Sequence, residues 1–152
     1  MEQPSDTLAL LKECSSGIET GVSSIKDALE YAHSQELRDL LNAYKVEHEH
    51  LRDEVQACIK ECAGDDPEAQ EKHTFSAAMG RVMSKMKINA ELAFNDKDTK
   101  VASLMSEGCE MGSRSLTCYV NQYKNADKKA KNLAGNIIRI EDELCDKLRK
   151  FL

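Results

Sequence analysis

Residues 34–64 read SQELRDLLNAYKVEHEHLRDEVQACIKECAG, and this stretch carries the signals of one long amphipathic helix. Ser34 is a favourable N-cap, and Glu36 places a negative charge beside the exposed N–H groups of the first turn. Gly64 is suited to end the helix. Between these ends, apolar side chains recur on one helical face: Leu37, Leu40, Tyr44, Leu51, Val55, Cys58 and Cys62. The stretch predicts a helix over residues 34–63.

The same periodicity predicts four more helices along the chain. Pro4, Ser5 and Asp6 form a helix start, and Asp65-Asp66-Pro67-Glu68 combines an Asp cap, a proline at the first helical position and an acid behind it. Polar turns separate the remaining segments. The predicted ranges are about 6–32, 67–94, 98–124 and 127–151. A helix of ~25 residues, typical of these ranges, is ~38 Å long.

The lengths of the connections predict how these helices pack. Short connections join 6–32 to 34–63 and 98–124 to 127–151, so each pair should form an antiparallel hairpin. A long connection with a helix of its own lies between the hairpins. This is the ferritin-like way to build a four-helix bundle. We therefore predict an all-α, single-domain protein over residues 1–152: a ferritin-like four-helix bundle with an extra helix in the long crossover.

Composition excludes several other classes of protein. The 152 residues include 7 glycines and 2 prolines, too few for the many tight turns of a β-sandwich or barrel. An apolar fraction of 41% argues against a disordered chain. A net charge of -6 argues against nucleic acid or an anionic membrane as partner. With no secretion leader and no run of ~18 apolar residues, we expect a cytoplasmic protein. No motif for nucleophilic catalysis or nucleotide binding occurs.

The sequence contains a faint internal repeat. Residues 17–21 and 108–112 both read Gly-x-Glu-x-Gly, and residues 45–49 and 139–143 both read basic, β-branched, Glu, polar, Glu. Counting from the turns places one acid from each bundle helix near mid-height: Glu19, Glu47, Glu110 and Glu141. Glu47-x-x-His50 has the spacing that puts a carboxylate and an imidazole on one helix face, where they could bind the same cation.

These residues resemble a known ligand arrangement. Glu19, Glu47, His50, Glu110 and Glu141 look like the ligand set of the ferritin-like di-iron carboxylate superfamily. The whole chain is similar to a bacterial family of small ferritin-like bundles that is classed as a domain of unknown function. The resemblance implies a bundle fold and a di-iron centre for oxygen or peroxide chemistry or for metal handling. Leu144 stands where a second Glu-x-x-His would place its histidine, which weakens a symmetric two-metal site and leaves room for an asymmetric one.

Two interpretations of function stay open at this point. In the first, Glu47 and Glu141 bridge two iron ions, Glu19 and His50 complete one site, and Glu110 completes the other. In the second, the protein is a metal-free structural or protein-interaction bundle without cofactor. A homodimer is one form it could take, and no protein partner is identified. On a helical wheel of ~100° per residue, Glu47 and Glu141 fall at the edges of the apolar stripes and the other three candidates fall further out.

His48 and the cysteines have simpler interpretations. His48 lies at the centre of the apolar stripe, between Tyr44 and Leu51, which predicts a hydrogen-bonded core residue that could titrate near neutral pH. The six cysteines, at positions 14, 58, 62, 109, 118 and 145, are expected to be reduced thiols. Cys58 and Cys62 are one turn apart, a geometry that could clip a metal but is more typical of two small buried hydrophobes.

Overall fold

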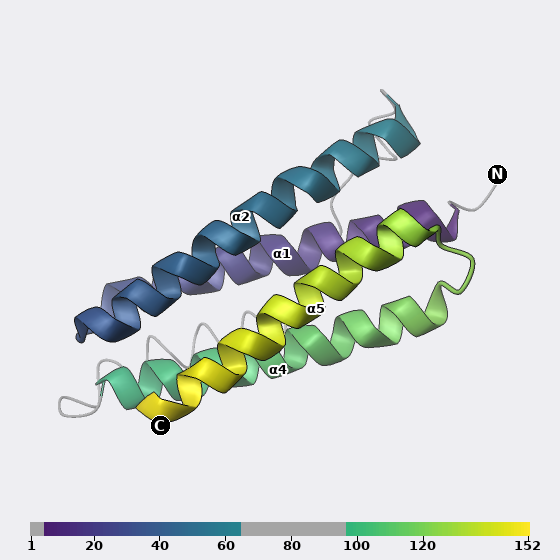
Figure 1. Ribbon diagram of the computed structural model, residues 1–152. Coiled ribbons are helices and arrows are strands. Elements are labelled where there is room, and N and C mark those ends of the chain that lie inside the picture. Colours follow the sequence, from purple (N-terminus) through teal and green to yellow (C-terminus); the bar gives the residue numbers. More distant parts are fainter. Residues whose placement is uncertain (1–4, 65–96) are drawn as a thin grey trace.

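The computed structural model describes residues 5–64 and 97–152, and the regular structure of these residues is helical (Figure 1). It comprises α1 (Asp6–Tyr31), α2 (Gln35–Ala63), α4 (Lys97–Gln122) and α5 (Lys128–Leu148), followed by the short 3₁₀ helix η1 (Arg149–Phe151). These bounds agree with four of the predicted ranges to within two residues when η1 is counted with α5. The helix predicted over 67–94 lies outside the described residues.

Local signals set the ends of the helices, as the sequence predicts. The Ser34 hydroxyl accepts a hydrogen bond from the backbone N–H of Leu37 at 3.2 Å. The Asp127 carboxylate likewise accepts from Ala130 N–H at 2.8 Å, at the start of α5. Gly64 ends α2 with a φ of 63°, in the left-handed region that glycine adopts without strain.

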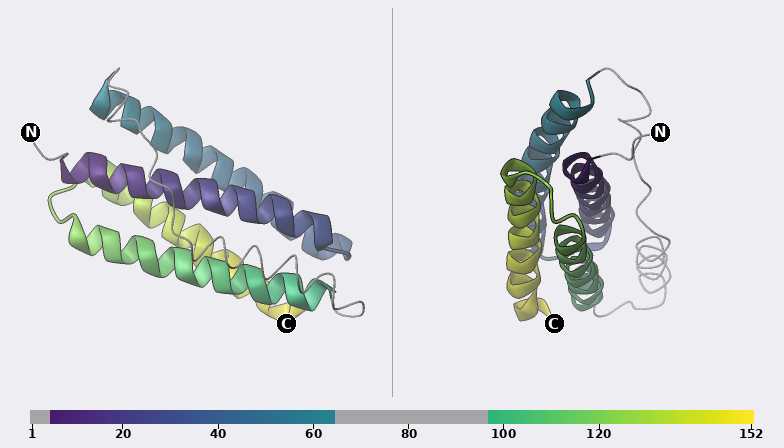
Figure 2. Two further views of the ribbon diagram at one scale, coloured as in Figure 1. Left: turned by 180° about the vertical axis from the view of Figure 1, so that it is seen from behind. Right: turned by 90° about the vertical axis from the view of Figure 1, so that its right-hand side faces the viewer.

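The four helices form two antiparallel hairpins that lie side by side (Figures 1 and 2). The first hairpin is α1 and α2, and the second is α4 and α5. Helix α1 packs against all three of the others, and α2 packs against α1 and α5. The described residues therefore form an all-helical bundle, which confirms the predicted class.

At each end of the bundle, the first helical turn of one hairpin forms hydrogen bonds with the connecting turn of the other hairpin. The Asp98 carboxylate, in the first turn of α4, accepts hydrogen bonds from the backbone N–H groups of His33 (2.6 Å) and Ser34 (2.9 Å). At the opposite end, the first turn of α1 binds the turn between α4 and α5. There Asp6 accepts from Asn125 N–H at 2.9 Å and Thr7 accepts from Asp127 N–H at 2.8 Å. These reciprocal contacts fix the position of one hairpin relative to the other along the length of the bundle.

The predicted apolar stripes meet in one core. Its largest fully buried side chains come from α1, α2 and α5: Leu10, Leu11, Ile18, Ile25, Leu37, Leu41, His48, Val55, Ile140, Leu144 and Leu148. Cys62 departs from the prediction, because it is exposed and not buried. It sits in the last turns of α2, where a cavity lies between the ends of α1, α2 and α5. Over residues 5–64 and 97–152, no helix has both the length and the apolar content to cross a membrane.

Candidate functional site

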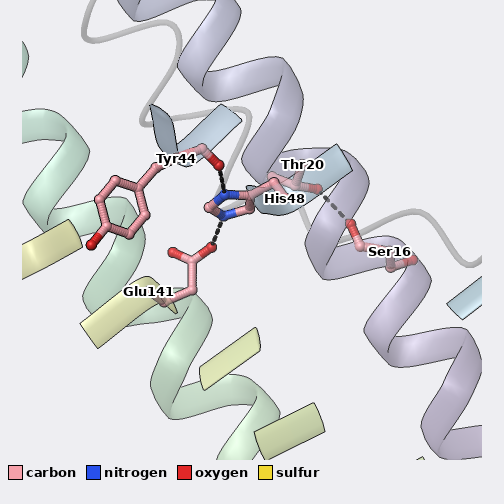
Figure 3. A network of polar contacts seen from close by, with 5 residues as sticks. All are labelled: Ser16, Thr20, Tyr44, His48 and Glu141. Atoms are coloured by element: carbon pink, nitrogen blue, oxygen red, sulfur yellow. Dashed lines mark hydrogen bonds and ion pairs between the residues drawn. The ribbon is translucent and has the colours of Figure 1, made fainter. Parts of the chain in front are cut away.

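A buried histidine–glutamate pair joins the two hairpins near the middle of the bundle (Figure 3). His48 projects from α2 and is 1% exposed, and Glu141 projects from α5 and is 7% exposed. The Nε2 atom of His48 lies 2.5 Å from Oε1 of Glu141, and its Nδ1 atom lies 2.6 Å from the carbonyl oxygen of Tyr44. The sequence-based prediction of a hydrogen-bonded core histidine is confirmed.

The partners of the ring fit its protonated form. A carbonyl oxygen can only accept, so Nδ1 donates to Tyr44. An ionised carboxylate also only accepts, so Nε2 donates to Glu141. The two bonds are therefore satisfied together by an imidazolium that faces a carboxylate. The opposite charges compensate one another where a single buried charge would be costly.

The electrostatic surroundings favour this charged form of His48. Burial is the largest influence on the pKa of His48 and lowers it. The hydrogen bond to Glu141, the charge of that carboxylate, the Tyr44 carbonyl and the charge of Glu47 act in the opposite direction. Together they raise the pKa of His48 above its ordinary value. Folding therefore favours protonation of this ring.

Two glycines from the repeated Gly-x-Glu-x-Gly segments line the pair. A Cβ atom at Gly21 of α1 would lie 2.7 Å from Cδ2 and 3.0 Å from Nε2 of His48, closer than packed atoms allow. A Cβ atom at Gly112 of α4 would lie 3.7 Å from Oε2 of Glu141, an ordinary contact. Gly21 is therefore required by the imidazole, whereas Gly112 only borders the carboxylate.

Cys109 of α4 completes the surroundings of Glu141. The residue is 3% exposed. Burial, followed by the charge of Glu141 and a hydrogen bond to it, raises the pKa of the Cys109 thiol well above its ordinary value. The thiol is therefore neutral near pH 7, and a neutral thiol is neither an effective nucleophile nor an effective metal ligand. All four bundle helices contribute to the site: Gly21, His48, Cys109, Gly112 and Glu141.

Tyr44 adds further contacts between α2 and α5. Its hydroxyl lies 3.3 Å from Oε2 of Glu143, and the Nζ atom of Lys147 lies 5.1 Å from the centre of its ring. Glu143 is also paired with Arg139 at 3.0 Å. One turn of α2 thus contacts α5 through a ring, a hydroxyl and an imidazole, and the Tyr44 carbonyl holds that imidazole from within α2.

The five predicted metal ligands do not come together in the structure. Glu141 is buried, whereas Glu47 and His50 are exposed on α2. Glu110 has 67% of its side chain exposed and lies 3.5 Å from Arg114, and Glu19 is half-buried. In the part of the chain that the structure describes, no group of three or more histidine, cysteine, aspartate or glutamate side chains could hold a metal ion. The di-iron centre stays a prediction.

The rotation of α2 explains why its two candidates face outward. His48 occupies the buried face, so Glu47 and His50 are turned ~100° and ~200° away from it around the helix. Sequence periodicity identified His48 as a core residue and placed Glu141 at mid-height, but it did not pair them. Their similar depth and the apolar neighbours of both were the signals that could have suggested the pair.

Comparisons with protein-family models, curated proteins and solved structures give no match to this chain. The functional conclusion therefore rests on the chain's own side chains.

Proposed function

We propose that the protein is a helical bundle with a metal-free core that works as a structural or protein-interaction module. The observation that carries this proposal is the direct bond between Glu141 and His48, at 2.5 Å. Glu141 is the only one of the five candidate ligands that is buried, and its carboxylate is already compensated by an imidazolium from the opposite hairpin.

A buried ion pair of this kind suits a scaffold. Compared with well-packed apolar side chains, it adds little to stability, but losing one partner costs about 3–5 kcal/mol because the other charge is left uncompensated. The best-supported role of such pairs is to select one alignment of helices over others. In this bundle the pair would fix how α2 and α5, and with them the two hairpins, face each other.

The ferritin-like arrangement belongs to the same proposal. The two adjacent antiparallel hairpins support it, since a ferritin-like bundle is built from such hairpins joined by a long connection. Membership of the bacterial family, a cytoplasmic location and a homodimeric form remain predictions beside it. Light scattering of the purified chain measures the oligomeric state.

Metal analysis tests the proposal against the di-iron interpretation. Protein purified without chelator should hold no stoichiometric iron or manganese, and added Fe(II) should leave the melting temperature unchanged. A ligand present at 100 times its dissociation constant adds about 2.7 kcal/mol of stability. For a chain of this length, that gain raises the melting temperature by about 5–11 °C.

The exposed residue Glu47 provides the matched variant for this test. Glu47→Ala should leave both the metal content and the melting temperature of the protein unchanged, because the side chain is solvated on α2. Bound iron together with an Fe(II)-dependent rise in melting temperature that Glu47→Ala abolishes would overturn the proposal and establish the di-iron centre instead.

A further inference from the structure

Two cysteine side chains line the same cavity near the end of α2. Cys58 is 8% exposed and Cys62 is exposed, and the two are one helical turn apart. The cavity has a volume of about 240 Å³ and is bounded also by the first turns of α1 and α5. Small ions can reach it from the exposed side, where Cys62 lies.

The charged residues that line this cavity are Lys129, Glu61 and Asp127. The Nζ atom of Lys129 lies 3.3 Å from Oε2 of Glu61. Lys129 and Cys58 line the same cavity, and the pKa of Lys129 is raised, first by its hydrogen bond to Glu61. The N-terminal turn of α5, which also lines the cavity, adds the partial positive charge of its backbone N–H groups. The end of α5 and the ammonium group of Lys129 thus lie on the same cavity wall as the two thiols.

The nearby carboxylates are already engaged. Glu61 is paired with Lys129, and Asp127 accepts the capping hydrogen bond from Ala130 at 2.8 Å. Neither joins the cysteines in a set of ligands, since the described residues contain no group of three or more that could hold a metal. The cavity therefore offers two sulfur donors beside an ion pair.

We propose that Cys58 and Cys62 bind one Cu(I) ion as a two-coordinate dithiolate. Binding releases two protons and forms two copper–sulfur bonds without any change in oxidation state. The product, Cu(I) with two thiolates, carries one negative charge, and the ammonium group of Lys129 lines the same cavity. Thiolates are soft ligands that select Cu(I), and this ion accepts two ligands in a line, whereas zinc almost always takes four.

The spacing on the helix fits such a complex. Residues four apart on a helix have Cβ atoms about 5–6 Å apart. Two metal–sulfur bonds of ~2.3 Å, the length found in zinc thiolates, span ~4.6 Å when collinear. Rotation about the two Cα–Cβ bonds can bring the sulfurs to that separation without moving the backbone.

Competition with a chromophoric Cu(I) chelator tests the proposal on the full, reduced chain under anaerobic conditions. The wild-type chain should retain one Cu(I). Cys62→Ser should weaken binding by more than the ~10–100-fold that loss of an outer-shell partner costs, and Lys129→Gln should weaken it by ~10-fold. Cys118→Ser is the matched control, because Cys118 is exposed on α4, and it should bind as the wild type does.

Cys62→Ser carries the decision, because the residue is exposed and its loss leaves the core intact. Equal affinity in the wild type and Cys62→Ser, an equal loss in Cys118→Ser, or displacement of Cu(I) by equimolar Zn(II) would each overturn the proposal. This site is separate from the His48–Glu141 pair, so the copper measurement and the iron measurement can fail independently.

Discussion

His48 shows how one buried polar residue constrains its neighbours. Both of its ring nitrogens are bonded, at 2.6 Å to Tyr44 and at 2.5 Å to Glu141, so the ring cannot turn away without breaking a bond. A glycine in the middle of α1 is otherwise unfavourable by about 1 kcal/mol relative to alanine. Gly21 is tolerated because the imidazole occupies the space that a Cβ atom would need.

Alanine substitutions at the two glycines should therefore change the free energy of unfolding in opposite directions. Gly21→Ala should lower the free energy of unfolding by about 1–2 kcal/mol, because the contact at 2.7 Å outweighs the gain in helix propensity. Gly112→Ala should raise it by up to ~1 kcal/mol, because its Cβ atom meets Glu141 at an ordinary distance. Urea denaturation of both variants measures the difference. Equal effects of the two substitutions would show that His48 is not held where the structure places it.

The parts of this site were predictable one by one, but their combination was not. The apolar stripe of α2 identifies His48 as a core residue, because burial follows from period alone. The partner of His48 depends on how α5 is rotated about its axis relative to α2, and a one-dimensional pattern does not contain that angle. Several glutamates at similar depth were therefore equally good candidates, and the pattern did not single out Glu141 as the partner of His48.

At the scale of the helices, Asp98 links the start of α4 to the turn between α1 and α2. Burial is the largest influence on the pKa of Asp98 and raises it, but the hydrogen bonds from His33 and Ser34 together hold that pKa below its ordinary value. A lowered pKa means that the contribution of Asp98 to stability is present above the unfolded-state pKa and is lost as the pH falls through the folded one.

Asp98→Ala should lower the free energy of unfolding by about 1–2 kcal/mol at neutral pH, since two backbone donors lose a charged acceptor. The difference from the wild type should shrink as the pH falls below ~4, the usual pKa of an aspartate. Thermal unfolding across this pH range measures it. Asp53→Ala is the control, because Asp53 is exposed on α2. If Asp53→Ala lowered the free energy of unfolding as much as Asp98→Ala does, the cause would be a general charge effect and not the hydrogen bonds between the hairpins.

Helix ends were predictable because their signals are local. Ser34 and Gly64 act on backbone groups within four residues, and the structure uses both as caps. Cys62 was misplaced for the converse reason. Its position continues the apolar period of α2, but burial there depends on how closely the neighbouring helices pack, and a cavity lies between their ends at this point.

At the scale of the whole molecule, contacts at three levels hold the two hairpins together. The first turns of α1 and α4 bind the opposite turns at the two ends, and the His48–Glu141 pair joins α2 to α5 in between. The end contacts are partly exposed backbone bonds, whereas the central pair is buried. We propose that this pair, and not a metal ion, specifies the alignment of the bundle.

A double-mutant cycle on the pair tests that claim most directly. The variants are His48→Leu, Glu141→Leu and the double variant, with the free energies of unfolding measured in the presence of a chelator. Each single substitution should cost about 3–5 kcal/mol, because it leaves one buried charge uncompensated. The double variant should be more stable than either single variant, because apolar side chains then fill the site.

The coupling energy between His48 and Glu141 should also depend on pH, in a direction set by the pKa of His48. Because the pKa of His48 is raised by folding, the stability that its charge contributes is fully present below the unfolded-state pKa of ~6.5 and is lost as the pH rises through the folded one. We predict a coupling energy of about 2–3 kcal/mol or more near pH 6 that falls as the pH rises and is the same with chelator or with Fe(II). The account would be contradicted if the stability losses of the two single variants simply added up to the loss of the double variant. It would also be contradicted if a coupling energy appeared only in the presence of Fe(II).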